Sequence, residues 1–126
     1  MKHTNAFPKS QRLCSKYLID RLFEQGANKS LSAYPLRLVY RIEEGVGESQ
    51  LLISVPKRYF KHAVDRNHVK RLVREAYRTD RDTLKLPEGT HALFAVLWLD
   101  AHHRSQETVT AKLHTLLQRV SEECRQ

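Results

Sequence analysis

Residues 65–78, DRNHVKRLVREAYR, constrain the fold of this chain more than any other stretch. Placed on a helix at about 100° per residue, they separate into two faces. Apolar residues spaced i, i+3, i+4 and i+7 make one stripe, and a cationic arc lies roughly opposite. The stripe is Val69, Leu72, Val73 and Ala76, and the arc is Arg66, Asn67, Lys70, Arg71, Arg74 and Arg78. The pattern predicts a helix that packs on a core and displays a fixed array of positive charge.

This cationic arc indicates binding to a polyanion. Basic helices that are merely solvated usually carry acidic residues among the basic ones, which pair with them one turn away. No acidic residue lies inside this arc, and Glu75 is only at its edge. We therefore expect contact with nucleic acid, and a solvated surface helix is the alternative.

The positive charge of the chain is concentrated around this helix. The 126 residues include 22 Lys and Arg against 14 Asp and Glu, a formal net charge of +8. Residues 57–78 hold eight of the basic and two of the acidic residues, a surplus of six. Clustered charge is typical of nucleic-acid-binding proteins. We expect no membrane partner, because the apolar stripe is only as wide as a core-facing helix needs.

Other features of the sequence narrow the class of protein. No stretch has the length and apolarity of a transmembrane helix or signal peptide, so we expect a cytoplasmic protein. Cys14 and Cys124 form no CxxC pair, which favours free thiols over a disulfide. The seven histidines form no HxxxH pair, so we expect no metal site.

The remaining pattern predicts a single α+β domain over residues 1–126, with residues 1–13 as an extended arm. The first helix is expected over 15–25, between a Ser15 cap and Gly26. The basic helix should start between residues 61 and 65, and a last helix should follow a Ser105 cap. Strands are expected over 36–42, 50–55 and 91–99, with an optional edge strand near 29–32. Strand 36–42 should have a basic outer face, and 91–99 should be covered on both faces.

The connections predict how these elements assemble. Residues 43–49 are interpreted as the turn of an antiparallel hairpin between strands 36–42 and 50–55, with its glutamates solvated. Residues 79–89 are interpreted as a loop or frayed helix end. Strand 50–55, the basic helix and strand 91–99 form a βαβ unit if the strands are parallel, and the default crossover is right-handed.

We assign no catalytic residue to the sequence. Asp65 and Glu75 are the acidic residues of the basic region, and about 15 Å of helical rise separates them, so they cannot share a metal ion. No P-loop or GxGxxG is present, and nothing positions a Ser-His-Asp or Cys-His set. We expect any bond cleavage to belong to a partner.

Residues 53–78, ISVPKRYFKHAVDRNHVKRLVREAYR, resemble the signature region of the bacterial ribonuclease P protein subunit. In that family a strand and a Lys-rich turn precede a helix with the pattern RNRxKRxxRExxR. The upstream KSQRLCSKYLIDRLFEQG is similar to the family's first helix, and the last strand and helix fit in order and length. The residues that match the helix pattern are Arg66, Asn67, Lys70, Arg71, Arg74, Glu75 and Arg78. His68 departs from it, so stacking or hydrogen bonding by an imidazole replaces a guanidinium contact, or the contact is lost.

The resemblance implies both a fold and a function. The fold resembles the second domain of ribosomal protein S5, with the order α-β-β-(β)-α-β-α and a left-handed βαβ crossover, which we adopt over the default. The function is that of the protein in a ribonucleoprotein whose RNA removes the 5′ leader of precursor tRNA. The implied partners are ribonuclease P RNA and precursor tRNA, without DNA. The implied cofactor is Mg²⁺, bound mainly by the RNA and the substrate.

Two groups of binding residues follow from the resemblance. The first group contacts the catalytic RNA and consists of Arg66, Asn67, His68, Lys70, Arg71 and Arg74. The second binds the leader, in a cleft between the first helix and the sheet and in the turn before the basic helix. It consists of Ile19, Phe23, Arg37, Val39, Lys57 and Arg58. For Ile19 and Phe23 the alternative is ordinary core packing.

Two other classes of protein are compatible with some of these features. A structural or ribosomal RNA-binding protein without a part in cleavage would carry the same charge distribution. A DNA-binding helix-turn-helix protein is disfavoured, because a strand rather than a short helix precedes the basic helix.

Overall fold

The structure is a computed structural model that describes residues 12–13, 15–24, 26, 28–45 and 47–124. Most of the predicted N-terminal arm, together with Cys14, lies outside these residues. The described chain forms a mixed α+β fold, as predicted. Its elements are α1 (Lys16–Leu22), β1 (Lys29–Ala33), β2 (Leu36–Glu44), β3 (Gln50–Ser54), α2 (Ala63–Asp80), the 3-10 helix η2 (Arg81–Thr83), β4 (Thr90–Trp98) and α3 (Gln106–Cys124).

The four strands form one sheet in the order β1-β2-β4-β3. The hairpin predicted between β2 and β3 is wrong, because β4 lies between them, antiparallel to β2 and parallel to β3. The physical reason is the sequence of β4, which is apolar on both faces and is therefore most stable in the middle of the sheet. The connection after β2 crosses two strand spacings, about 9.6 Å, which five residues span easily.

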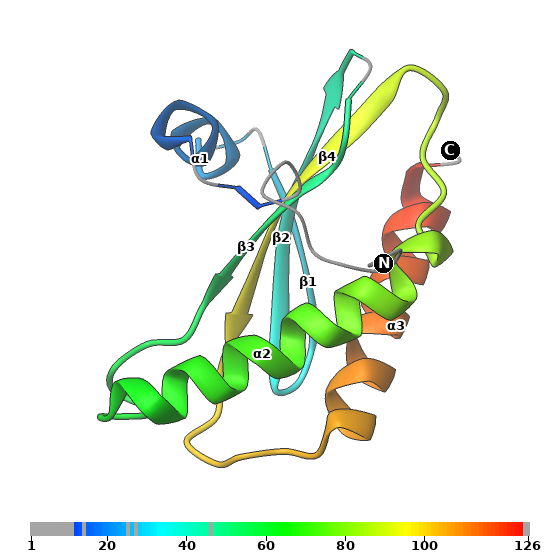
Figure 1. Ribbon diagram of the computed structural model, residues 1–126. Coiled ribbons are helices and arrows are strands. Elements are labelled where there is room, and N and C mark those ends of the chain that lie inside the picture. Colours follow the sequence, from blue (N-terminus) through cyan, green and yellow to red (C-terminus); the bar gives the residue numbers. More distant parts are fainter. Residues whose placement is uncertain (1–11, 14, 25, 27, 46, 125–126) are drawn as a thin grey trace, which may run out of the picture.

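Strands β3 and β4 are parallel, so the unit β3-α2-β4 is a βαβ crossover, the case that the sequence pattern had left open. It carries α2 over one face of the sheet (Figure 1). The left-handed sense that the resemblance implies stays a prediction.

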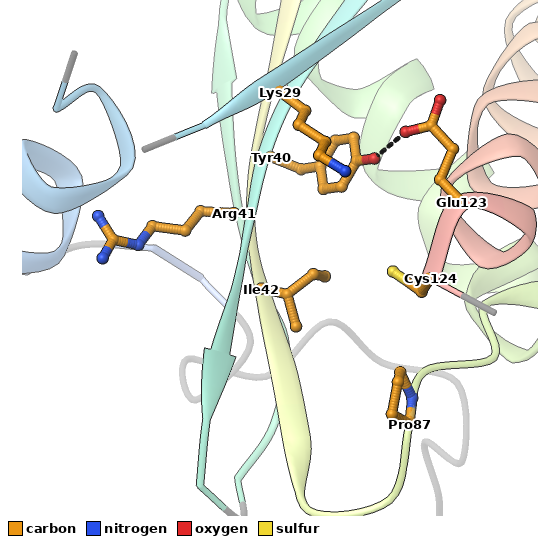
Figure 2. A pocket seen from close by; sticks show the side chains of 7 residues that line it. All are labelled: Lys29, Tyr40, Arg41, Ile42, Pro87, Glu123 and Cys124. Atoms are coloured by element: carbon orange, nitrogen blue, oxygen red, sulfur yellow. Dashed lines mark hydrogen bonds between the residues drawn. The ribbon is translucent and has the colours of Figure 1, made fainter. Parts of the chain in front are cut away.

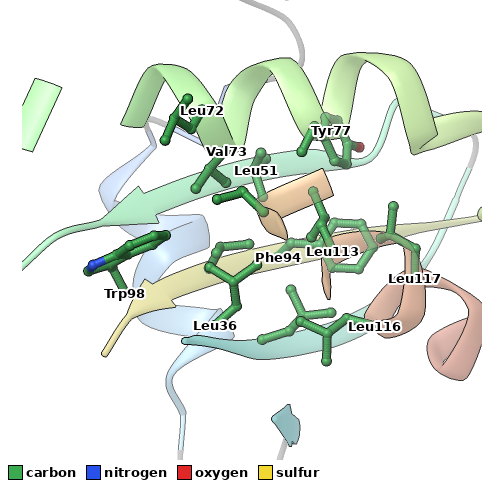
Figure 3. Packing of buried hydrophobic residues seen from close by; sticks show 14 of the residues in the cluster. Leu36, Leu51, Leu72, Val73, Tyr77, Phe94, Trp98, Leu113, Leu116 and Leu117 are labelled. Atoms are coloured by element: carbon green, nitrogen blue, oxygen red, sulfur yellow. The ribbon is translucent and has the colours of Figure 1, made fainter. Parts of the chain in front are cut away.

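Two apolar clusters hold the layers together on opposite faces of the sheet. In β4, Phe94 and Trp98 point to the larger cluster, which α2 and α3 cover, while Leu93 and Ala95 point to the smaller one. This alternation is the two-residue repeat of a strand that is buried on both sides. Figure 3 shows the larger cluster, in which residues of α2 and α3 meet those of the strands. The smaller cluster lies under α1 and adds Leu13, Leu22 and Val39.

The basic helix begins at Ala63, within the predicted interval, and buries the predicted apolar stripe together with Tyr77. It ends at Asp80, so residues 79 and 80, predicted to be loop or frayed helix, are helical. The reason is Tyr77, whose ring lies 6.3 Å from that of Phe94 and fixes the last turn on the sheet. Burial there raises the pKa of Tyr77 to about 12.

The two other helices begin at their predicted caps. The Ser15 hydroxyl accepts a hydrogen bond from the Leu18 amide at 3.4 Å, and the Ser105 hydroxyl accepts one from the Thr108 amide at 3.1 Å. Helix α1 ends at Leu22, three residues before its predicted end. The Asn28 side-chain amide donates to the Leu22 carbonyl at 2.7 Å and satisfies the helix end there. None of the described helices combines the length and apolarity needed to cross a bilayer.

Candidate nucleic-acid interface

The outer face of α2 carries the residues predicted to contact RNA. Because the helix is continuous from Ala63 to Asp80 and its opposite stripe is buried, these side chains project from one side of a fixed element. Asn67, Arg71 and Arg74 are exposed, and Arg66 and Lys70 are half-buried. We call Arg66, Asn67, Lys70, Arg71 and Arg74 the α2 face.

Three cations of the α2 face have no partner within the described part of the chain. Lys70, Arg71 and Arg74 make no ion pair or hydrogen bond with any described residue. Arg78, which the helical pattern places in the same arc, is different. Its guanidinium is paired with the Glu75 carboxylate, with Nε and Oε1 3.1 Å apart, and this contact lowers the pKa of Glu75. Lys70, Arg71 and Arg74 are therefore available to bind an anion, whereas the charge of Arg78 is already neutralised by Glu75.

Arg66 fastens the start of α2 to the turn before it. Its Nη1 donates hydrogen bonds to the carbonyls of Phe60 at 3.0 Å and Lys61 at 2.9 Å. These partners are neutral, so the guanidinium keeps its positive charge. A guanidinium has five donors, and the remaining ones can reach an anion. Arg66 thus both shapes the turn and adds charge to it.

The turn before α2 presents two further predicted residues, Lys57 and Arg58, to solvent. The Arg58 guanidinium lies 5.0 Å from the centre of the Tyr59 ring, a cation–π arrangement that restrains it. His62 is the N-cap residue of α2 and makes no side-chain capping bond. The amides of Ala63 and Val64, at the positive end of the helix dipole, make no hydrogen bond with a described residue and are available to an anion beside these cations.

His68, predicted to contact the catalytic RNA, lies beside the α2 face, toward the loop between β4 and α3. Its exposed ring meets the ring of His103, from the loop between β4 and α3, with centroids 5.2 Å apart in an edge-to-face arrangement. The sequence offered no signal for this contact, because the two residues are 35 positions apart.

The residues predicted to bind the leader on α1 and β2 lie on the other side of the sheet from α2. Phe23 is the C-cap of α1 and is 45% exposed, while Ile19 is partly buried against the smaller cluster. Arg37 is exposed and donates through Nε to the Ser30 hydroxyl at 2.9 Å. Val39, in contrast, is buried with Leu22 in the smaller cluster.

The basic outer face predicted for β2 is therefore only partly correct. At Val39 that face is covered by α1. The Arg41 guanidinium is 3.1 Å from the Glu43 carboxylate and 3.5 Å from that of Glu24. Of the two arginines on this face of β2, Arg37 and Arg41, only Arg37 presents a cation that no described carboxylate meets.

Glu43 was expected to be solvated in a turn, and instead it joins α1 to β2. Its carboxylate accepts hydrogen bonds from Arg21 of α1, at 2.7 Å from Nε and 3.2 Å from Nη2. The bond from Arg21, followed by the charge of Arg41, holds the pKa of Glu43 below its usual value. This network pins α1 to the sheet and offsets the charge of both arginines.

A cavity of about 480 Å³ lies away from the α2 face, between β2 and the end of α3. Figure 2 shows the Tyr40 hydroxyl hydrogen bonded to the Glu123 carboxylate, with Ile42 and Cys124 nearby. Arg41 points away from it, to the opposite side of β2. Burial and the bond to Glu123 raise the pKa of Tyr40. The cavity has mixed polarity, and none of the residues predicted to bind RNA lines it.

Comparison with protein families gives a match along most of the chain. The family model described as Ribonuclease P matches residues 7–121. The chain is 47% identical to the ribonuclease P protein component of Porphyromonas gingivalis over 83 residues, or 64% of this chain. It is 36% identical to the component from Chlorobium phaeobacteroides over 110 residues, covering 77% of this chain and 74% of the relative. The first match spans 59% of the length of the Porphyromonas relative. A match to the Chlorobaculum tepidum component spans 56% of the length of that component.

Solved structures agree with this assignment. The ribonuclease P protein of Thermotoga maritima superposes with a TM-score of 0.64 at 27% identity, covering 86% of this chain and 96% of that one. The Staphylococcus aureus protein superposes with a TM-score of 0.65 at 16% identity, over 92% and 99% of the two chains, and supports the fold alone. With its family match over residues 7–121, its relatives and its fold, the chain belongs to the bacterial ribonuclease P protein family.

Proposed function

We propose that this chain serves as the protein component of a ribonuclease P ribonucleoprotein. In this role it binds the catalytic RNA and the 5′ leader of precursor tRNA, and the RNA cleaves the leader. The observation that carries the proposal is the α2 face, where Lys70, Arg71 and Arg74 have no partner among the described residues. A helix that is held rigidly by its buried stripe and leaves such charges available is suited to bind a phosphate backbone.

The α2 face forms the proposed contact with the catalytic RNA. Each phosphate that a lysine or arginine neutralises releases condensed counterions, which favours binding and makes it dependent on salt. Asn67 adds a side-chain amide that can donate to or accept from RNA groups. Because α2 is already packed on the sheet, its backbone loses little conformational freedom when RNA binds. The entropic cost falls mainly on the long lysine and arginine side chains.

The leader is proposed to lie along α1 and β2 and to reach Lys57 and Arg58. Phe23 offers an exposed aromatic ring on which a base can stack, and Arg37 offers a cation that no described carboxylate meets. Val39 and the inner part of Ile19 form the apolar support beneath them. Stacking on one ring contributes about 1–3 kcal/mol per base without a requirement for sequence.

Magnesium is assigned in this proposal to the RNA and the substrate. Among the described residues, no three His, Cys, Asp or Glu side chains are grouped so that they could hold a metal ion. The α2 face repels a divalent cation and attracts the phosphates that bind one. Since protein cations and Mg²⁺ both neutralise phosphates, the help given by the protein should be greatest when Mg²⁺ is scarce.

Reconstitution tests the proposal. The full chain is combined with a transcribed bacterial ribonuclease P RNA, and cleavage of a precursor tRNA is measured at low Mg²⁺. We expect faster cleavage, and tighter binding of precursor tRNA than of mature tRNA, because only the precursor carries a leader. Phe23→Ala should reduce that preference, whereas Lys112→Ala, an exposed cation on α3, should not. Equal binding of both tRNAs and no acceleration would contradict the proposal and support a structural RNA-binding role.

A further inference from the structure

Three rings from separate segments meet beside the first turns of α2. Phe60 of the preceding turn is buried and lies 4.7 Å from His103, centroid to centroid, with the planes tilted by 34°. His68 of α2 approaches the same His103 ring at 5.2 Å. The side chain of His103 is 44% exposed, and His68 is exposed. Phe60 is thus the apolar floor of a cluster whose two imidazoles reach solvent.

The loop that carries His103 is anchored on both sides of it. Asp100 is 4% exposed, and its carboxylate accepts hydrogen bonds from the His102 amide at 3.3 Å and from Arg104 Nε at 2.6 Å. The Trp98 indole donates to the Asp100 carbonyl at 2.7 Å. Burial acts to raise the pKa of Asp100, but the hydrogen bonds that its carboxylate makes with the His102 side chain, Arg104 and the His102 amide hold it at about 2. Because its neighbours are fixed in this way, His103 is held over α2.

A carboxylate orients the His103 ring. Its Nε2 lies 3.3 Å from Oδ1 of Asp65, in the first turn of α2. The nearby negative charge makes this cluster a poor place for a phosphate, but it does not oppose a neutral base. RNA-binding proteins stack unpaired bases on histidine as well as on larger aromatic side chains. The chemistry of the cluster therefore favours a nucleobase as its ligand.

The ring cluster is continuous with the α2 face. His68 precedes Arg71 by three residues, so the two side chains are neighbours on the helix surface. A strand of RNA whose phosphates follow Arg71 and Arg74 can therefore place a base against His68 and His103. The cluster occupies the position where the family pattern has an arginine and this chain has His68.

We propose that His68 and His103, supported by Phe60, form a stacking site for an unpaired base of the RNA bound by the α2 face. This inference rests on the proposed function and adds to it a base contact from the loop between β4 and α3. The site recognises the π-face of a base, and so it tolerates different sequences.

Two substitutions of His103 test the stacking site in the full chain. His103→Ala removes the ring, and His103→Phe keeps a ring but removes the hydrogen bond to Asp65. The probe is a transcribed bacterial ribonuclease P RNA, and affinity is measured over a range of salt concentrations. We expect His103→Ala to bind about fivefold more weakly, the lower end of the effect of one stacked base. His103→Phe should bind within about twofold of wild type, and neither change should alter the salt slope, because no phosphate contact is lost.

Chemical probing of the bases in the same complexes supplies a readout that a purely structural role would not change. At least one base should be protected by the wild-type chain and by His103→Phe but not by His103→Ala. Unchanged affinity of His103→Ala, equal weakening by both substitutions, or a reduced salt slope would each overturn the inference. Failure of the wild-type chain to accelerate cleavage of precursor tRNA would instead contradict the proposed function, so the two failures are distinguishable.

Discussion

The pairing of Arg78 with Glu75 leads to a quantitative prediction about the α2 face. The sequence places Arg71, Arg74 and Arg78 on one cationic arc, but in the structure Arg78 is already neutralised by Glu75. Arg71→Ala with Arg74→Ala should therefore remove two phosphate contacts, whereas Arg78→Ala should remove almost none. Comparison of the double variant with Arg78→Ala distinguishes cations that are available to RNA from a cation that is already paired within the protein.

The magnitude follows from counterion release. Each contact contributes about −0.7 to −0.9 to the slope of log K against log salt. In the wild-type chain, where Lys70, Arg71 and Arg74 each contact a phosphate, the affinity contributed by these three residues should fall roughly 20-fold to 40-fold between 50 and 200 mM salt. In the double variant only Lys70 of the three remains, and the corresponding fall in affinity is about threefold. Arg78→Ala should keep nearly the wild-type slope.

Binding of the labelled ribonuclease P RNA, titrated at four or more salt concentrations, measures these slopes. Circular dichroism and thermal melting of each variant serve as the control for folding, because all three arginines lie at least partly at the surface. If Arg78→Ala flattens the slope as much as Arg74→Ala does, the assignment of available charge is wrong. An unchanged slope in the double variant would remove Arg71 and Arg74 from the interface.

The remaining predictions concern stability. Leu72→Ala should lower the free energy of unfolding by about 2–5 kcal/mol in urea denaturation, because Leu72 is buried in the larger cluster. The pKa of Asp100 is about 2 in the folded chain, against 3.8 for an ordinary aspartate. The ionised carboxylate therefore stabilises the fold fully at pH values above 3.8, and this stabilisation is lost as the pH falls toward 2. Asp100→Asn should remove this part of the acid dependence, and an unaltered acid profile would contradict it. The pKa of Tyr77 is raised from 10.0 to about 12, so stability should decrease as the pH rises through this interval, and Tyr77→Phe should flatten that decrease.

Much of the fold could be predicted from the sequence where the relevant interactions are local. The apolar stripe of α2 repeats at helical spacing, and the caps at Ser15 and Ser105 are set by residues three positions away. The strand 91–99 was predicted to be covered on both faces, and β4 is. Helix periodicity and capping act within one or two turns, so the chain itself displays them.

The order of the strands could not be predicted in the same way. A turn containing glycine between two strands favours a hairpin, and β2 and β3 were paired on that basis. The pairing is decided instead by the burial of β4, which is most favourable between two other strands. This competition depends on the whole sheet, so no local pattern contains it.

The sequence by itself determined that this protein has an amphipathic helix with a cationic outer arc, because helix geometry places residues three and four apart on one face. Only the tertiary structure decided which partners the charged and aromatic side chains meet from distant parts of the sequence. Glu43 neutralises Arg21 from 22 positions away, and His103 reaches His68 from a loop on the other side of β4. These contacts depend on how the layers pack, because folding brings together side chains that no sequence spacing relates.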